Sequence, residues 1–162
     1  MRKDKLELTY EVYSDISELP DEDRELLIKA RQITSEAYAP YSKFQVGAAA
    51  RIGKKIITGT NQENASFPVG ICAERSLLST SASLYPGQPI DTLAISYLNK
   101  NENATSGQPI SPCGMCRQAL QEYETRGGKS MRIILGGQEG EVYILNGIRT
   151  LLPFGFTSDQ LK

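Results

Sequence analysis

The stretch Ser111-Pro-Cys-Gly-Met-Cys-Arg-Gln118 contains two of the three cysteines in this 162-residue chain, Cys113 and Cys116. The third, Cys72, lies in Gly70-Ile-Cys-Ala-Glu-Arg75, and the chain has no histidine. Cysteines with this spacing can form a metal site, a redox pair with an unrelated third thiol, or small buried parts of the core. The metal site is favoured, because each of the two cysteine segments lies where a loop leads into a predicted helix.

Hydrophobic spacing predicts an alternation of helices and strands along the chain. Residues 4–13 alternate loosely, which is typical of a short strand or an ordered arm. The expected helices are 21–38, 72–84 and 113–124, and the expected strands are 44–48, 55–60, 92–98, 131–135 and 141–145.

This order predicts an α/β fold in which helices cover both faces of one mixed, five-stranded sheet, giving three α-β-α layers. The connection Gly136–Gly140 is too short for a crossover helix, so the last two strands should pair antiparallel. We expect residues 1–20 to form an N-terminal extension and residues 21–162 to form a single catalytic domain.

Composition excludes several classes of function. The formal net charge is −1, and no patch of Lys and Arg stands out, so long nucleic acid is not an expected partner. The apolar runs are too short for a membrane span, and the charged N-terminus lacks the apolar core of a secretory signal. An odd number of cysteines argues against a disulfide framework, and a cytoplasmic location is therefore expected.

Both cysteine segments fall at the start of a predicted helix that follows a loop. Free backbone N–H groups and the positive end of the helix dipole favour a thiolate there, and the thiolate is the form that binds metal. Three thiolates and one open position are typical of catalytic zinc, whereas structural zinc sites use four protein ligands. A fourth ligand would have to be a carboxylate, water or substrate.

Glu74 follows Cys72 by two residues, so it can reach a water molecule at the metal without being a ligand. Zinc lowers the pKa of such a water, and a nearby carboxylate can accept and return its proton. Arg75 can withdraw charge from a cysteine sulfur. Cys-x-Glu together with Pro-Cys-x-x-Cys is the pattern described for zinc deaminases.

With these motifs the chain resembles the cytidine deaminase family, in its small form that acts on free nucleosides. The resemblance extends from about Leu26 to Leu161. Its motifs are Tyr41-Ser-Lys-Phe-Gln-Val-Gly-Ala-Ala49, Asn61-Gln-Glu-Asn-Ala-Ser66, Cys72-Ala-Glu-Arg75, Ser111–Gln118 and Leu151-Leu-Pro-Phe-Gly-Phe156.

The resemblance implies zinc-dependent hydrolysis of cytidine and 2′-deoxycytidine to the uridine forms, with release of ammonia, as a step of pyrimidine salvage. It implies one Zn²⁺ per subunit and a homotetramer with shared active sites. Glu74 would be catalytic, and Arg75 and Gln118 would support the ligands. The implied zinc ligands are Cys72, Cys113 and Cys116, and the implied substrate-binding residues are Phe44, Asn61, Glu63, Ala65, Ala73 and Phe156.

Alternatives stay open at this point. Another zinc aminohydrolase of the same fold could act on a cytosine-nucleoside antibiotic, although Asn61 and Glu63 favour a plain ribose. A non-catalytic module stabilised by zinc is a different class, and the acid at Glu74 argues against it. Each residue also has an ordinary structural interpretation when it is considered alone. Asn61 would be a turn residue, Phe44 a core residue and Arg75 a charged residue on the surface of a helix.

Overall fold

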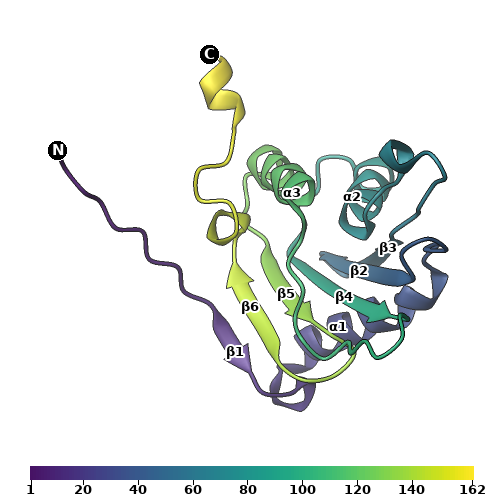
Figure 1. The fold of residues 1–162 in the computed structure, drawn as a ribbon. Helices are drawn as coiled ribbons and strands as arrows, with labels where there is room; N and C mark the ends of the chain where they lie inside the picture. Colours follow the sequence, from purple (N-terminus) through teal and green to yellow (C-terminus); the bar gives the residue numbers. More distant parts are fainter.

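A mixed sheet of six strands forms the centre of the computed structural model, which describes residues 1–162 (Figure 1). The strand order is β1-β6-β5-β4-β2-β3. The strands are β1 (Glu11–Tyr13), β2 (Phe44–Ile52), β3 (Lys55–Thr60), β4 (Thr92–Asn99), β5 (Arg132–Gly136) and β6 (Val142–Asn146). The helices are α1 (Asp21–Ile33), α2 (Ala73–Leu84) and α3 (Gly114–Gly127).

Local sequence explains where these elements begin and end. Three acids occupy the first turn of α1, where the helix dipole is positive. Gly128 closes α3 in the left-handed conformation, with φ of 63°, and Gly53 provides a positive φ in the turn between β2 and β3. None of the helices combines the length and apolar character that a membrane crossing requires.

Two hydrophobic cores lie on opposite faces of the sheet. On one face α1 packs Leu26, Leu27 and Ala30 against β2, β4, β5 and β6. On the other face α2 and α3 cover the larger core, to which they contribute Leu77 and Leu120. The expected three-layer arrangement is therefore confirmed.

The expected number of strands was wrong, because the sheet has six strands and not five. The additional strand is β1, which pairs antiparallel with β6 through Glu11, Val12 and Tyr13. Three paired residues are too few for the alternation of apolar and polar residues to identify a strand. The strand forms because the edge of β6 offers it a partner. The antiparallel pairing of β5 with β6 is confirmed.

The first helix is also shorter than its hydrophobic spacing predicts. It ends at Ile33 and is followed by one 3-10 turn, Thr34–Glu36. Beyond this turn the backbone of Tyr38 is extended, because its N–H donates to Asn61 O and its carbonyl accepts from Glu63 N. This pairing with the segment after β3 takes the chain out of the helix and places it beside the candidate site.

Strand directions bring the two cysteine segments together. β2 is antiparallel to both β3 and β4, so β3 and β4 run the same way. Their carboxyl ends lie at the same edge of the sheet, and α2 and α3 both begin beyond that edge (Figure 1).

Glycines permit the helices to approach the sheet closely. A Cβ at Gly59 in β3 would lie 2.6 Å from Leu77 N and 2.7 Å from Ala73 O, both in the backbone of α2. A Cβ at Gly47 in β2 would lie 2.2 Å from Ala30 O in α1. A methyl group at either position would therefore have to displace a helix.

We predict that Gly59→Ala destabilises the fold by about 1–3 kcal/mol, the usual cost of overpacking. The variant should also bind zinc more weakly, because the displaced backbone belongs to the first turns of α2, next to Cys72. Chemical denaturation and a zinc titration measure the two effects. Ser79→Ala, on the exposed side of α2, is the control, and unchanged stability of Gly59→Ala would contradict the close approach.

Candidate metal centre and adjoining pocket

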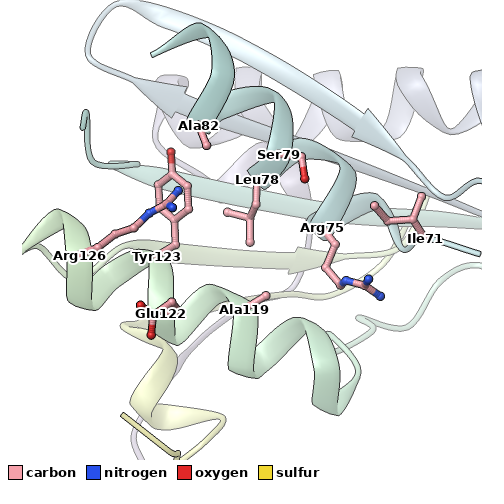
Figure 2. A pocket seen from close by; sticks show the side chains of 9 residues that line it. All are labelled: Ile71, Arg75, Leu78, Ser79, Ala82, Ala119, Glu122, Tyr123 and Arg126. Carbon is pink, nitrogen blue, oxygen red and sulfur yellow. The ribbon is translucent and has the colours of Figure 1, made fainter. Parts of the chain in front are cut away.

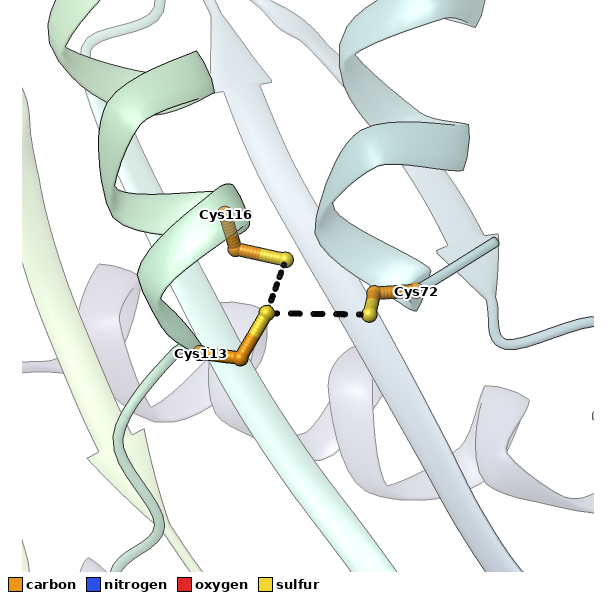
Figure 3. Close-up of side chains that lie close together, drawn as sticks. All are labelled: Cys72, Cys113 and Cys116. Atoms are coloured by element: carbon orange, nitrogen blue, oxygen red, sulfur yellow. Dashed lines mark hydrogen bonds between the residues drawn. The ribbon is translucent and has the colours of Figure 1, made fainter. Parts of the chain in front are cut away.

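The three cysteine sulfurs converge at the starts of two helices. Cys72 is the residue before α2, Cys113 is the residue before α3, and Cys116 lies in the first turn of α3 (Figure 3). The Sγ atoms of Cys72 and Cys113 are 3.9 Å apart, and those of Cys113 and Cys116 are 3.4 Å apart. All three sulfurs lie within 4.8 Å of one another, so one ion can contact them together.

This sulfur triangle fits zinc. A Zn–S bond of about 2.3 Å with tetrahedral angles places two sulfurs about 3.8 Å apart. Cys116 is fully buried, Cys72 is half-buried and Cys113 is exposed, so the triangle is closed on the protein side and open on the other. The donor set therefore supplies three ligands and leaves one position facing outward.

The thiols share protons unequally. Hydrogen bonding with Cys116 lowers the pKa of Cys72 to about 6, and Cys113 and the positive charge of Arg75 act in the same direction. Burial and the neighbouring Glu74 oppose this shift in the pKa of Cys72. The pKa of Cys116 is raised, first by its hydrogen bond with Cys72 and then by burial. The charge of Arg75 thus favours the thiolate form of Cys72.

Glu74 is buried beside the sulfurs in the first turn of α2, with 5% of its surface exposed. Burial raises the pKa of its carboxyl, while its own backbone N–H, the Cys116 thiol and Arg75 partly offset this rise in pKa. A carboxyl in this environment gains and loses a proton more readily near neutral pH than a solvated one.

A cavity of about 580 Å³ opens next to the sulfurs, and Cys72 forms part of its wall. Asn61 and Glu63, in the segment following β3, also line the wall, and Gln62 between them pairs with Ile71, the residue before Cys72. Carboxylate and amide groups therefore face the same space as a metal-binding thiol. The lining residues are Tyr41, Ser42, Asn61, Gln62, Glu63, Asn64, Phe67, Gly70, Ile71, Cys72 and Met115.

Glu63 is held in place by a backbone turn. Its Oε2 accepts from the N–H groups of Tyr41, at 2.9 Å, and Ser42, at 3.3 Å. Bonding with the Ser42 side chain and these two N–H groups lowers the pKa of Glu63. The carboxylate is therefore ionised at neutral pH, and its second oxygen can accept a bond from a ligand.

A distant loop supports the same turn. Asn101 donates from Nδ2 to Ser42 O at 2.8 Å, and Lys100 N donates to Lys43 O at 2.9 Å. A chain of hydrogen bonds thus leads from the loop after β4, through Ser42, to Glu63. Asn101 was not identified from the sequence, where it is one polar residue among many in a turn-rich segment.

Asn61 connects the pocket to β2. Its Oδ1 accepts from Val46 N at 2.7 Å, and its Nδ2 donates to Phe44 O at 2.9 Å. Since a carboxamide has two donor hydrogens and two acceptor lone pairs, each end keeps one free. Phe44 is half-buried and stacks on Tyr97, with ring centroids 4.9 Å apart, and it is not among the residues that line the cavity.

The tail that contains Phe156 is fastened to α3. Gln118 donates from Nε2 to Phe156 O at 2.8 Å, and Gln121 donates to the same oxygen at 3.3 Å. Phe156 exposes 54% of its surface. Gln118 therefore anchors the tail through the backbone and leaves the aromatic side chain outside.

The two alanines occupy different environments. Ala73 is fully buried in the larger core at the start of α2, directly after Cys72. Ala65 is exposed on the loop between Glu63 and the short helix Phe67–Val69, and it does not line the cavity.

A second pocket, of about 310 Å³, lies between α2 and α3 (Figure 2). Arg75 lies at one end of it, near Ile71. At the other end the Arg126 guanidinium stacks 4.2 Å from the centre of the Tyr123 ring. This groove carries no cluster of metal-binding groups, so the chemistry is concentrated at the sulfurs and in the larger cavity.

Besides Asn101, two further residues of the site were not identified from the sequence. Arg117 donates from Nε to Pro112 O at 2.8 Å and from Nη1 to Leu151 O at 2.9 Å, which fixes the loop before Cys113. Met115 is 65% exposed and lines the cavity. Both lie within the Ser111–Gln118 motif, which was the only signal that could have indicated them.

Comparison with known proteins identifies a family that matches this chain. Residues 20–128 match the family model for the cytidine and deoxycytidylate deaminase zinc-binding region. The chain belongs to the cytidine deaminase family. It is 37% identical over 142 residues to a cytidine deaminase of Halalkalibacterium halodurans, covering 86% of this chain and 98% of the relative.

Two further relatives agree with this membership. A cytidine deaminase of Mycobacterium tuberculosis is 36% identical over 117 residues, covering 71% of this chain and 80% of the relative. The crystal structure of cytidine deaminase from Burkholderia pseudomallei has a TM-score of 0.68 and 36% identity, covering 82% of this chain and 97% of that one.

We predict that Cys113→Ala abolishes stoichiometric zinc binding, because two thiolates and an open site hold zinc far less tightly than three thiolates. Elemental analysis after dialysis against a weak chelator measures the metal content. Ser111→Ala is the matched control on the same loop and should retain zinc. Full zinc occupancy in Cys113→Ala would remove this cysteine from the ligand set.

Proposed function

We propose that this family member catalyses the zinc-dependent hydrolytic deamination of cytidine and 2′-deoxycytidine. The products are uridine, or 2′-deoxyuridine, and ammonia, which places the reaction in pyrimidine salvage. The observation that carries the proposal is the cavity wall, which joins a member of the three-sulfur cluster to Asn61 and Glu63. One Zn²⁺ per subunit is implied by one such cluster.

At the base end, a zinc ion on Cys72, Cys113 and Cys116 would supply a Lewis acid that lowers the pKa of a water molecule. Glu74 accepts a proton from this water and delivers it to N3 of the base. It then transfers the second proton to the departing amine, so that water and cytidine yield uridine and ammonia. The raised pKa of the buried Glu74 suits a group that must take up and release protons at neutral pH.

At the sugar end, Asn61 and Glu63 hold the ribose. The ionised carboxylate of Glu63 accepts a hydrogen bond from the 3′ hydroxyl, and the fixed carboxamide of Asn61 provides a further donor and acceptor. Phe44 and Phe156 do not line the cavity of a single chain, and we propose that Phe44 packs beside the base and that Phe156 covers it when the nucleoside is bound. Ala65 and the buried Ala73 complete the proposed substrate-binding residues.

A homotetramer with shared active sites is part of the proposal. Phe67 and Met115 line the cavity, and more than half of the surface of each, and of the nearby Val69, is exposed. Solvent-facing apolar groups beside a polar pocket are typical of a surface that another chain covers. The segment around Ala65, beside the same cavity, would then complete the site of an adjoining subunit.

The cellular location and the domain boundaries are also part of the proposal. Three free cysteines with metal-binding geometry suit a reducing compartment, which supports a cytoplasmic location. Residues 21–162 would form the catalytic domain, with residues 1–20 as an extension to it.

Ultraviolet absorbance tests the reaction directly. Zinc-loaded protein should convert the cytidine spectrum to that of uridine, and a chelator should abolish the change. No conversion of cytidine or 2′-deoxycytidine would contradict the proposal. Conversion of a modified cytosine nucleoside instead would indicate an aminohydrolase that acts on a nucleoside antibiotic. If no cytosine nucleoside were converted, the protein would be a zinc-stabilised module without activity.

We predict that Glu74→Gln retains zinc but loses turnover by at least about 100-fold, the lower range for general acid–base catalysis. The amide fills the same space but cannot transfer protons. Steady-state kinetics and elemental analysis are measured on the same preparation. Glu122→Gln, on the exposed side of α3, should behave as wild type, and turnover in Glu74→Gln close to that of wild type would exclude the proton-transfer role.

We predict that Glu63→Gln lowers kcat/KM for cytidine by about 10- to 100-fold, since a hydrogen bond to a charged group contributes about 1.5–3 kcal/mol. The loss should be much smaller with 3′-deoxycytidine, which lacks the proposed hydroxyl. Asn101→Ala should show a weaker effect with the same substrate dependence, because it loosens the turn at Ser42 that orients Glu63. Glu102→Ala is the neighbouring control, and equal losses with both substrates would contradict a sugar contact.

A further inference from the structure

The N-terminal residues form an amphipathic extended arm. Residues 1–10 are all exposed and lead away from the domain (Figure 1). Leu6, Leu8, Tyr10 and Val12 alternate with mostly charged residues, and each exposes between 51% and 56% of its surface. In an extended chain these side chains share one face, so the arm presents an apolar stripe to solvent.

The base of the arm shows which way this stripe faces. Val12 pairs with Tyr143 in the β1–β6 register, and the rings of Tyr10 and Tyr143 are 5.2 Å apart. Leu8 and Tyr10 line a pocket of about 220 Å³ together with Leu135 and Leu145. The stripe therefore continues the face of the sheet that α2 and α3 cover, at a place where no helix covers it.

β1 is also a free sheet edge. It is the terminal strand of the sheet and pairs only with β6. An exposed edge with unpaired backbone groups and an apolar stripe is a template for pairing with another strand. Lys3 and Lys5 precede Glu7 and Glu11 on the opposite face of the arm, so the arm has positive charge toward one end and negative charge toward the other.

We propose that the arms of two copies of this chain pair antiparallel about a two-fold axis at Leu8. This register places Leu8 against Leu8, Leu6 against Tyr10 and Lys5 against Glu11, each pair occurring symmetrically. On one face the central Leu8 pair and the two Leu6–Tyr10 pairs bring apolar groups together, with Val12 against Asp4 at each end. On the other face Lys5 meets Glu11, which has the opposite charge. The two sheets become one continuous sheet through their β1 edges, and the interface is isologous.

Neighbouring registers are less favourable. A shift of the centre by one residue, to Glu7 or Thr9, places two glutamates opposite each other, either Glu7 against Glu7 or Glu7 against Glu11. Like charges directly opposite are destabilising. A centre at Leu6 avoids this repulsion but places two apolar residues against charges, Leu8 against Asp4 and Tyr10 against Arg2, whereas the centre at Leu8 places only Val12 against Asp4. A centre at Tyr10 confines the pairing to residues 7–13, because β1 ends at Tyr13. The sequence of the arm therefore selects Leu8 as the centre.

A disulfide cross-link tests this register without reference to deaminase activity. Residues opposite each other in an antiparallel pair have Cα atoms about 4.5–5.5 Å apart, within the range for a disulfide. Zinc-loaded Leu8→Cys should therefore form a covalent dimer on mild oxidation, seen on a non-reducing gel and located by peptide mass spectrometry. Wild-type protein, with its cysteines on zinc, gives the background.

Val12→Cys is the matched control, because it lies on the same face and is equally exposed but faces Asp4 in the paired arms. Leu8→Cys should cross-link at least about 10-fold faster, as expected when two groups are held together and do not meet by diffusion. Adding Lys5→Glu to Leu8→Cys should slow the reaction, while adding Lys3→Glu should slow it less. Equal rates for Leu8→Cys and Val12→Cys, or no effect of Lys5→Glu, would overturn the proposal.

Discussion

The shared direction of β3 and β4 is the constraint on which the rest of the structure depends. Because β2 is antiparallel to both, the two strands end at the same edge of the sheet. Each is followed by a loop and then by a helix that begins near that edge. Cysteines separated by about forty positions can therefore lie within one ion's reach, although nothing in their local sequence brings them together.

Electrostatics explains why such a cluster calls for a cation. Two thiolates about 4 Å apart repel by about 4 kcal/mol at an effective dielectric constant near 20. The pKa of Cys72 is lowered and the pKa of Cys116 is raised. Without a cation, therefore, Cys72 is ionised while Cys116 keeps its proton. A divalent ion held by these thiolates would remove this conflict. Arg75 would then offset part of the residual negative charge and so help such an ion to act as a Lewis acid.

The sequence predicted which residues meet at the site better than it predicted what holds them there. Residue types and spacing predicted one site containing the three cysteines and Glu74, because few side chains can bind zinc or transfer protons, and the structure places these residues together. The motif could not reveal Asn101, whose contribution depends on Ser42, a residue far away in sequence that the fold brings next to it. Long-range hydrogen bonds of this kind leave no periodic signal.

The fold, too, was predictable where it depends on local sequence and not where it depends on long-range contacts. The hairpin of β2 and β3 and the antiparallel ending of the sheet were predictable, because short turns leave few alternatives. The end of α1 was not, since hydrophobic spacing continues past Ile33 while the backbone of Tyr38 pairs with the segment after β3. Alternation over residues 4–13 left β1 undecided between a short strand and an arm, because only three of its residues pair and their partner, β6, lies near the other end of the sequence.

Both ends of the chain combine polar anchoring with outward-facing apolar side chains. At the C-terminal end, Gln118 and Gln121 fix the backbone of Phe156 while its ring stays largely in solvent. At the N-terminal end, backbone pairing fixes β1 while Leu6 and Leu8 remain half-exposed. Fixing a backbone costs conformational entropy, and these side chains recover little of it by burial within their own chain. In the proposed assembly, surfaces on other copies of the chain would bury these side chains and compensate for this cost.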